Sequence, residues 1–251
     1  MNLMLIEPEE LTHDNTVRVA GQRLRHLREV LGLADGATLR VGVVDGPRGT
    51  AVVRSMDADE AALECTFEPA APDRPAVDLL LALPRPKVMR RLFAQLAALG
   101  VGRIVLTNAA RVERHYFDAH ILSPQVYRPL LIEGLQQAKD TRLPLVTVHR
   151  QFRVLIEDDL QGLVGGGGVR LVAQPGDAPS IAQRAAEARP VRLVLAIGPE
   201  GGWNEFELAL LKSHEFLPIS LGTRTLRSDT ACIALLTLAH DALRQGAPSS
   251  V

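Results

Sequence analysis

Glycines and two oppositely charged side chains gather near the end of the chain, in residues 197–231. A predicted strand, Val191–Ile197, runs into Gly198-Pro199-Glu200-Gly201-Gly202, and a second one, Phe216–Leu221, runs into Gly222. Backbone approaches a ligand most closely where side chains are absent, and ligands of open α/β sheets settle beyond the carboxyl ends of the strands. The spacing therefore predicts one pocket that both loops share.

Two charged residues in these loops, Glu200 and Arg227, are candidates for the chemistry. Glu200 lies in a glycine-flanked turn, where a charge is costly unless it meets a partner. Arg227 precedes a predicted helix whose N-terminus carries positive potential, which favours a nearby anion such as Glu200, another carboxylate or a phosphate. The alternative interpretation treats both loops as ordinary strand-to-helix connections, which are commonly about two to six residues long.

Other motifs of catalytic or metal-binding proteins are missing from the sequence. Gly165–Gly168 lacks the Gly-Lys-Ser/Thr of a phosphate-binding loop and precedes a strand, which favours a flexible turn. The dinucleotide fingerprint Gly-x-Gly-x-x-Gly and the nucleophile elbow Gly-x-Ser-x-Gly do not occur. His115 and His120 lack the spacing of zinc ligands, and we expect no metal site.

The composition, with 47% hydrophobic and 23% charged residues, is that of a soluble protein. No apolar run approaches the roughly 20 residues that span a bilayer, and the N-terminus lacks the basic region of a signal peptide. Cys65 and Cys232 lie far apart in apolar contexts, which favours buried thiols over a disulfide. These features predict a cytoplasmic protein without membrane contact.

Arginine greatly outnumbers lysine and is concentrated in three short segments, although the net charge is only −1. A planar guanidinium donates two hydrogen bonds at once to a phosphate. Each cluster alone is typical of a solvated surface, whereas the three together favour a basic face. The basic residues of these clusters are Arg23, Arg25, Arg28, Arg85, Lys87, Arg90, Arg91, Arg111 and Arg114.

The hydrophobic pattern divides the chain into residues 1–72 and 73–251, with a proline- and alanine-rich linker at Pro69–Pro75. The first part contains short strands punctuated by turns, and one helix, Gln22–Leu31, with three leucines on one face. This pattern predicts a small β-barrel. Its predicted strands are Thr16–Ala20, Ala37–Val44, Thr50–Ser55 and Ala61–Phe67.

In the second part, strands and helices alternate, beginning with the continuous apolar run Val77–Leu83 and a helix that Gly100 ends. Such alternation predicts a mainly parallel sheet with helices on both faces. The other predicted strands are Arg103–Thr107, Leu143–His149, Val169–Ala173, Val191–Ile197 and Phe216–Leu221. The other predicted helices are one that Ser123-Pro124 opens, Ala178–Ala188, and Glu205–Ser213 with a capping box of Asn204 and Glu207.

The last predicted helix, Asp229–Arg244, is apolar around nearly its whole circumference. A helix of this kind is buried, either in the core or against another subunit. The second alternative predicts a homodimer.

The signature Ile197-Gly198-Pro199-Glu200-Gly201-Gly202, with Leu221-Gly222 and Leu226-Arg227-x-x-Thr230-Ala231, resembles that of the 16S ribosomal RNA uridine methyltransferases of the SPOUT superfamily. The resemblance extends along the whole chain. His26-Leu27-Arg28 resembles the N-terminal PUA-like segment of that family, and Arg85-Pro86-Lys87 resembles the opening of its methyltransferase domain. A further family motif is matched by Glu133, Gln137, Arg142 and Pro144.

The resemblance implies an α/β protein: a PUA-like RNA-binding β-barrel in residues 1–72, then a SPOUT methyltransferase domain with a C-terminal trefoil knot in residues 73–251. It also implies a homodimer, and S-adenosylmethionine bound among the loops Ala173–Pro175, Gly198–Gly202 and Ser220–Leu226. The implied cofactor-binding residues are Ala173, Gln174, Ile197, Gly198, Pro199, Glu200, Gly201, Gly202, Ser220, Leu221, Gly222, Leu226, Thr230 and Ala231.

The implied product is uridine methylated at ring position three in the 16S rRNA of the small ribosomal subunit. Arg227 would stabilise the uracil anion, and Glu200 would be the base, with Asp229 or water as alternatives. Basic residues would contact RNA phosphates while the target base flips into the pocket. The implied RNA-binding residues are Arg23, Arg25, Arg28, Arg85, Lys87, Arg90, Arg111 and Arg142.

The sequence departs from the family pattern in three places. Ser228-Asp229-Thr230-Ala231 replaces the usual Thr-Glu-Thr-Ala, Asp140 stands where arginine is usual, and Gln95 and Ala98 replace a lysine and a glutamate. These departures bear on the RNA substrate more than on the cofactor. The alternative functions are another SPOUT enzyme, such as a tRNA ribose methyltransferase, and a catalytically silent RNA-binding or ribosome assembly factor.

Overall fold

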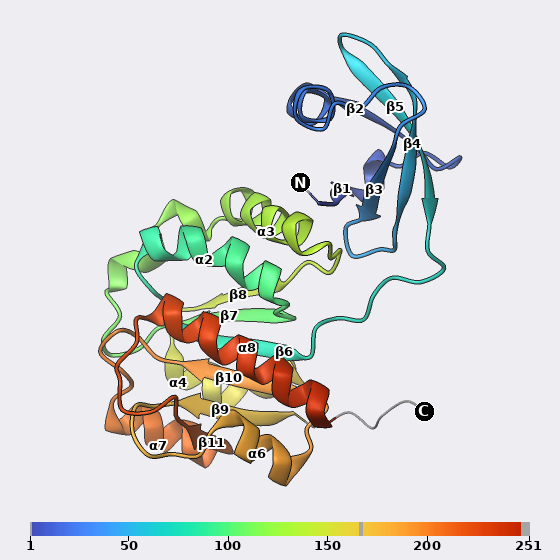
Figure 1. Ribbon diagram of the computed structural model, residues 1–251. Helices are drawn as coiled ribbons and strands as arrows, with labels where there is room; N and C mark the ends of the chain where they lie inside the picture. The colour runs from blue at the N-terminus through green and yellow to red at the C-terminus, as the bar shows by residue number, and fades with distance from the viewer. Residues whose placement is uncertain (1, 166–167, 247–251) are drawn as a thin grey trace. The chain divides into compact units, whose positions relative to one another are not determined.

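The computed structural model describes residues 2–165 and 168–246, which form two compact units (Figure 1). The first unit comprises the chain up to Arg74 together with Ile132–Leu143, and the second comprises Pro75–Leu131 and the chain from Pro144 onward. Helix α3, Pro124–Ala138, therefore contributes residues to both units. No helix of the described residues is long and apolar enough to cross a membrane.

The first unit is built on a five-stranded sheet with the order β1-β3-β4-β5-β2. β1 and β3 are parallel, and the other neighbours are antiparallel. Since the two ends of this order do not pair with each other within the described residues, the predicted barrel is an open half-barrel. The strands are β1 (Met4–Ile6), β2 (Thr16–Ala20), β3 (Thr38–Val43), β4 (Arg48–Met56) and β5 (Glu60–Phe67).

The predicted helix after β2 is present, but its hydrogen-bond pattern changes midway. α1 (Gly21–Arg25) continues into a π-helical turn, His26–Val30, in which the N–H of Leu31 donates to the carbonyl of His26. Leu24 and Leu27 are buried in the core of this unit, whereas Leu31 is 38% exposed. The prediction that Leu31 shares their face is wrong, because the wider turn rotates it away from the 3.6-residue period.

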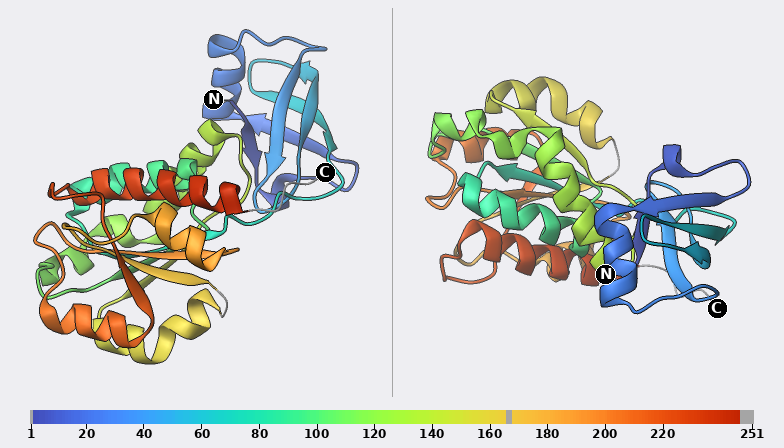
Figure 2. Two further views of the ribbon diagram at one scale, coloured as in Figure 1. Left: turned by 60° about the horizontal axis from the view of Figure 1, so that its bottom comes forward. Right: turned by 90° about the horizontal axis from the view of Figure 1, so that it is seen from above.

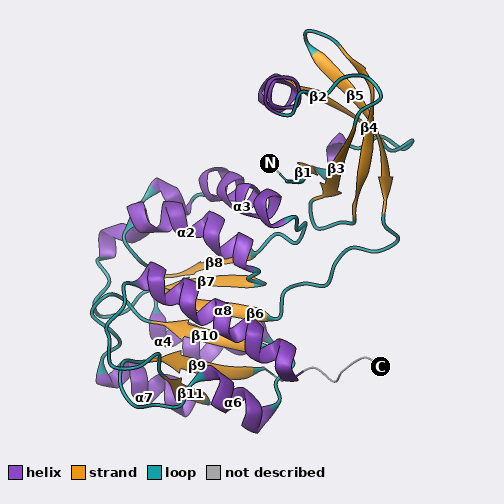
Figure 3. Cartoon of the chain, in the orientation of Figure 1, coloured by secondary structure: helices purple, strands orange, loops and turns teal. Residues whose placement is uncertain are grey.

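The second unit is built on a six-stranded sheet with the order β11-β9-β10-β6-β7-β8, and its neighbouring strands are parallel. The carboxyl ends of parallel strands lie at one edge of a sheet, so the loops after β9, β10 and β11 leave from the same edge. Figure 3 shows the strands of this sheet in orange and the helices around it in purple. The strands are β6 (Val77–Ala82), β7 (Arg103–Thr107), β8 (Leu145–His149), β9 (Val169–Ala173), β10 (Leu193–Ile197) and β11 (Phe216–Ile219).

Helices cover both faces of this sheet, as predicted. Figure 2 shows α2 and α8 on one face, and the segment of α4 and α5 together with α7 on the other. The helices are α2 (Pro86–Leu99), α4 (Phe152–Val154), α5 (Leu160–Val164), α6 (Ile181–Ala188), α7 (Glu205–Ser213) and α8 (Ser228–Gly246). A π-helical turn joins α4 to α5 at Leu155–Asp159, and 3-10 turns lie at Pro8–Glu10, Arg114–Asp118 and His120–Leu122.

The three helix ends for which the sequence predicts terminating residues lie at those residues. Gly100 ends α2 in the left-handed conformation, at φ 80°, and Asn204 and Glu207 form the capping box of α7. Pro124 is the first residue of α3, but within the described residues the Ser123 hydroxyl has no hydrogen-bond partner. Ser123-Pro124 opens the helix as predicted: the carbonyl of Ser123 accepts the first helical hydrogen bonds, while its hydroxyl does not take part.

Helix α8 is buried on one face only. Cys232, Leu235 and Leu236 pack in the core, whereas Ile233 and Leu238 are 37% and 43% exposed. The two predicted environments therefore divide between the two faces of the helix. Burial in the core is confirmed for one face, and a subunit interface stays a prediction for the other.

Both cysteines are free, buried thiols, as predicted. Cys65 belongs to the core of the first unit, and burial raises its pKa to about 11. Burial also raises the pKa of Cys232. Since the thiolate is the reactive form, neither residue is suited to nucleophilic chemistry.

A buried ion pair joins β6 to the start of β10. The Asp78 carboxylate is fully buried, and Arg192 donates to it through Nε at 2.9 Å and through Nη2 at 2.7 and 2.8 Å. A buried carboxylate is stable only when such donors compensate for its lost hydration. The pair therefore supports the register of the two central strands.

We expect Arg192→Ala to lower the free energy of unfolding by about 3 kcal/mol, because it removes the cation from a buried carboxylate. The matched control is Arg244→Ala, which breaks an exposed pair with Asp241, 3.3 Å apart, and should change this free energy by less than about 0.5 kcal/mol. Urea unfolding of the three proteins measures both effects. If both variants lost the same free energy of unfolding, the buried pair would contribute no more to stability than the exposed one, contrary to this prediction.

Candidate functional site

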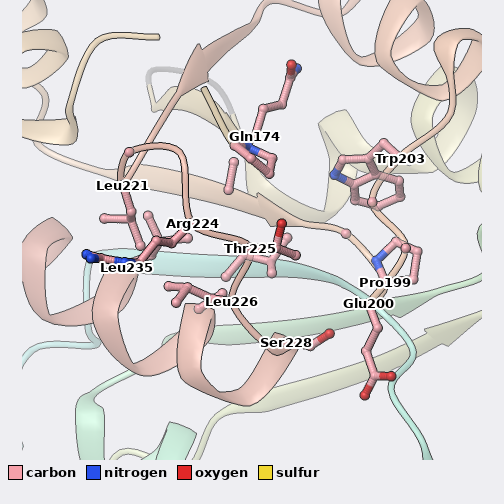
Figure 4. Close-up of a pocket in the computed structure, with 18 of the residues that line it drawn as sticks. Gln174, Pro199, Glu200, Trp203, Leu221, Arg224, Thr225, Leu226, Ser228 and Leu235 are labelled. Atoms are coloured by element: carbon pink, nitrogen blue, oxygen red, sulfur yellow. The ribbon is translucent and has the colours of Figure 1, made fainter. Parts of the chain in front are cut away.

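A cavity of about 340 Å³ lies beyond the carboxyl ends of three neighbouring strands (Figure 4). The loop after β9 contributes Ala173–Pro175, the loop after β10 contributes Gly198–Trp203, and the loop after β11 contributes residues between Leu221 and Leu226. Helix α8 closes the cavity with Ser228, Ala231 and Leu235. The pocket that the sequence predicts between the two glycine loops is therefore present.

The predicted cofactor-binding residues all line this cavity except Ser220 and Thr230. Thr230 is exposed in the first turn of α8, and Ser220 forms hydrogen bonds between loops. Arg224 and Thr225 line the cavity within the predicted loop Ser220–Leu226, and four lining residues lie outside the predicted loops and contacts: Trp203, Leu208, Ser228 and Leu235. Ser228 and Leu235 lie three and four residues from Ala231, and residues at these spacings share a helix face. The helical period therefore offered a way to predict these two lining residues from the sequence.

The wall after β10 is formed by a glycine packed against an indole. A Cβ atom added to Gly198 would lie 3.0 Å from Trp203 Nε1, so a larger residue would displace the indole. The Trp203 ring also contacts the Phe152 ring, with the ring centroids 5.3 Å apart. Trp203 Nε1 is buried and has no hydrogen-bond partner in the described part of the chain. The indole is thus fixed in place, with an N–H that a ligand could use.

The loops after β9 and β11 are tied to each other. The N–H of Gly176 donates to the Gly222 carbonyl at 3.1 Å, and the Ser220 hydroxyl lies 2.6 Å from the Gly176 carbonyl. The N–H of Gly222 in turn donates to Ser220 Oγ at 2.9 Å. Gly176 and Gly222 have φ angles of 127° and 101°, which other residues rarely adopt. Ser220 therefore holds two walls of the cavity together from behind.

The buried carboxylate of Glu207 ties the wall after β10 to the segment after β7. Glu207 Oε1 accepts from the N–H of Ala110 at 2.6 Å, and Oε2 accepts from the N–H of Asn204 at 2.8 Å. Asn204 Oδ1 accepts from the N–H of Glu207 at 2.8 Å and completes the capping box. The predicted cap of α7 thus also joins two loops of the site.

The two predicted catalytic residues differ in their relation to the cavity. Glu200 lines it, and its half-exposed carboxylate lies 3.9 Å from the guanidinium of Arg85. Arg227 is exposed and not among the lining residues, although Leu226 and Ser228 on either side are. Among the described residues, the Arg227 side chain makes no hydrogen bond or ion pair, so the charge near Glu200 is Arg85.

Asp229, the alternative base, is held in place by the protein. Its carboxylate accepts from Arg91 at 3.0 Å and from the N–H of Thr230 at 2.9 Å. No group of three His, Cys, Asp or Glu side chains in the described part of the chain is placed to hold a metal ion. The arrangement can therefore bind a small ligand in a mainly apolar cavity with one carboxylate, Glu200, on its wall.

The family model of the RNA methyltransferase domain matches residues 72–240. The ribosomal RNA small subunit methyltransferase E of Treponema pallidum is 32% identical over 248 residues, which cover 96% of this chain and 92% of that protein. The chain belongs to the RNA methyltransferase family. This finding confirms the family that the C-terminal signature predicts.

Two further comparisons cover nearly the whole chain. The ribosomal RNA small subunit methyltransferase E 1 of Borreliella burgdorferi is 24% identical, covering 93% of this chain and 95% of that protein. The crystal structure of the ribosomal RNA small subunit methyltransferase E of Neisseria gonorrhoeae, bound to S-adenosyl methionine, gives a TM-score of 0.76 at 20% identity. It covers 96% of this chain and 97% of that one, so the mixed α/β fold is shared along the chain.

The predicted RNA-binding residues fall into two groups. In the first group, the side chains bind other parts of the protein. Arg23 forms an ion pair with Glu10, and Arg28 donates hydrogen bonds to the carbonyls of Asp57 and Ala58. Arg142 donates to the carbonyls of Asp45 and Pro72. Arg85 and Arg111 also belong to this group. The second group is exposed and, within the described residues, makes no hydrogen bond or ion pair: Arg25, Lys87 and Arg90.

We expect Glu207→Ala to lower the free energy of unfolding by about 2 kcal/mol, because two backbone N–H donors lose their acceptor. The emission of Trp203, the one tryptophan of the chain, should shift to longer wavelength as the wall loosens. Glu205→Ala is the control, since Glu205 is exposed in the same helical turn and its loss should cost less than about 1 kcal/mol. Denaturant unfolding monitored by tryptophan fluorescence measures both effects. If Glu207→Ala were as stable as Glu205→Ala, the bridging role of Glu207 would be refuted.

Proposed function

We propose that this member of the RNA methyltransferase family transfers the methyl group of S-adenosylmethionine to N3 of a uridine in the 16S rRNA of the small ribosomal subunit. The observation that carries the proposal is the single cavity that three loops form beyond adjacent parallel strands. Family membership supports the class of reaction. The relatives named ribosomal RNA small subunit methyltransferase E support ribosomal RNA as the substrate.

The residues around the cavity fit a nucleoside cofactor. A volume of about 340 Å³ lies within the range of small-molecule sites, roughly 300–1,000 Å³. Leu226, Ala231 and Leu235 provide an apolar wall for a planar base, and the glycines expose backbone N–H and carbonyl groups. Ser228 Oγ and Trp203 Nε1 are buried and, within the described residues, without partners, so they supply polar groups for a ligand.

S-adenosylmethionine, when bound, supplies a methyl group on a positively charged sulfur, which is already activated for transfer. The protein must align the uracil and accept its N3 proton. Glu200 is the proposed base, because its carboxylate lines the cavity and remains half exposed. Asp229 is less suited to this role, since Arg91 and the N–H of Thr230 already donate to its carboxylate.

Arg227 is the proposed electrostatic catalyst. The uracil ring gains negative charge as N3 loses its proton, and a guanidinium placed nearby stabilises that charge. Arg227 lies between two residues that line the cavity, and its exposed side chain has no ion-pair partner among the described residues. Its charge is therefore available to a substrate at the mouth of the cavity.

For the RNA, we propose phosphate contacts from the half-barrel, as a PUA-like module formed by residues 1–72, and from the basic residues of α2. Arg25, Lys87 and Arg90 are exposed and uncommitted within the described part of the chain, which supports this role. The target base would leave the RNA stack to reach the cavity, as enzymes that modify bases require.

We further propose a homodimer, a C-terminal trefoil knot and a cytoplasmic location. The exposed apolar side chains of Ile233 and Leu238 on α8 support a subunit interface, because burying them would remove apolar surface from water. The knot and the location are supported by the family resemblance of the C-terminal signature.

We expect Arg227→Ala to reduce the rate of methyl transfer by about 100-fold or more, the usual cost of losing a group that stabilises developing charge. The dissociation constant for S-adenosylmethionine should change less than about threefold, because Arg227 does not line the cavity. Single-turnover assays and calorimetry measure the two effects, with Arg244→Ala as the control. Unchanged turnover would remove Arg227 from the mechanism.

The proposed product is tested by mass-spectrometric mapping of methylated uridine in rRNA from a strain that lacks the gene. Loss of one N3-methyluridine from 16S rRNA, restored by the wild-type gene, is the expected result. If the 16S rRNA of the strain that lacks the gene kept all of its methylated uridines, the proposed substrate would be refuted. Calorimetry that shows no binding of S-adenosylmethionine would instead favour the catalytically silent RNA-binding factor.

A further inference from the structure

Arg111 belongs to a cluster in which the sequence predicts RNA contacts, yet its side chain is directed at a wall of the cavity. Arg111 Nη1 donates to the carbonyl of Gly201 and lies 3.4 Å from the carbonyl of Gly202. Both glycines line the cavity. One nitrogen of the guanidinium can serve both carbonyls because Nη1 carries two N–H groups.

The stem of Arg111 also packs on Gly201. A Cβ atom added to Gly201 would lie 2.7 Å from Arg111 Cδ, which is closer than atoms of this kind approach. Gly202 has a φ of 75°, whereas Gly201 is not among the residues with positive φ. Backbone conformation therefore explains the glycine at position 202, and the contact with Arg111 explains the one at position 201.

The segment that carries Arg111 is anchored on both sides. The N–H of Ala110 donates to the buried carboxylate of Glu207 at 2.6 Å. Val112 is buried, and its N–H donates to the carbonyl of Ala109 at 3.0 Å. Arg111 therefore extends from a fixed turn toward the loop after β10, and the loop gains a support outside its own sequence.

We propose that Arg111 is a positioning residue, which holds the Gly198–Gly202 loop in the shape that accommodates S-adenosylmethionine. This inference rests on the proposed function, because it assumes that cofactor. In this role Arg111 acts through the two glycine carbonyls, and its contribution to RNA affinity is small. The prediction from the sequence that Arg111 contacts RNA is replaced by a role in the cofactor wall.

The first test compares Arg111→Ala with Arg114→Ala. Arg114 belongs to the same cluster, is exposed, and makes no hydrogen bond or ion pair within the described residues. Calorimetry and the fluorescence of Trp203 should show a dissociation constant for S-adenosylmethionine raised about tenfold in Arg111→Ala, as expected for losing hydrogen bonds from a charged donor. It should be unchanged in Arg114→Ala. The KM for RNA, and its dependence on salt, should stay within about twofold of wild type in Arg111→Ala.

The second test is a double-mutant cycle with Gly201→Ala. This substitution should weaken cofactor binding in the wild-type background, because its Cβ displaces Arg111. In the Arg111→Ala background it should add little, because the atom that it would meet is gone. Arg111→Lys keeps the charge, but its side chain is one atom shorter than the path to Nη1, so it should bind the cofactor nearly as poorly as Arg111→Ala. Circular dichroism checks that each variant is folded.

The outcomes separate this inference from the proposed function. Wild-type protein that does not bind S-adenosylmethionine would overturn the proposed function and this inference with it. If the wild-type protein and Arg111→Ala bound S-adenosylmethionine equally tightly, this inference alone would be overturned. A raised KM for RNA with a weaker salt dependence in that variant would assign Arg111 to the RNA. Additive effects of Gly201→Ala and Arg111→Ala would likewise count against the contact between them.

Discussion

Parallel pairing of β9 with both β10 and β11 is the constraint on which the site depends. Because the three strands run in one direction, their following loops must leave the sheet at the same edge, and a cavity forms between them. The ties between the loops then set the shape of that cavity. Ser220 joins the loops after β9 and β11, while Glu207 and Arg111 hold the loop after β10 from the side of β7.

This division explains why polar residues near the site differ in function. Glu207 and Ser220 are buried and fully engaged with backbone groups, so they shape the walls. Glu200 is half exposed on the wall, and Arg227 is exposed between Leu226 and Ser228, two residues that line the cavity. Groups that can meet a substrate are therefore those that the fold leaves uncommitted.

Asp140 illustrates the opposite case: its carboxylate accepts from the N–H of Thr141 and pairs with Arg48 at 3.5 Å, so an acid at this position stabilises the first unit locally.

The sequence predicts the features that depend on local patterns. The ends of β2, β7 and β9, the capping box at Asn204 and the glycine loops around the cavity follow from periodicity and turn residues. Features that depend on distant contacts do not: the place of β9 between β10 and β11, the contact between Gly198 and Trp203, and the bond from Arg111 to Gly201. The three-residue strand β1 is too short for any alternation, and Leu31 leaves its expected face because of a π-helical turn.

The strand order also has a consequence for folding during synthesis. β6, β7 and β8 pair in the order in which they are made, whereas β6 also pairs with β10, which lies far along the chain, as in the pair of Val77 and Leu193. One edge of β6 therefore stays unpaired until β10 has left the ribosome, and β9 and β11 join the sheet only through β10. Since such non-local pairing is slow, the cavity forms only after β10 and β11 have been synthesised.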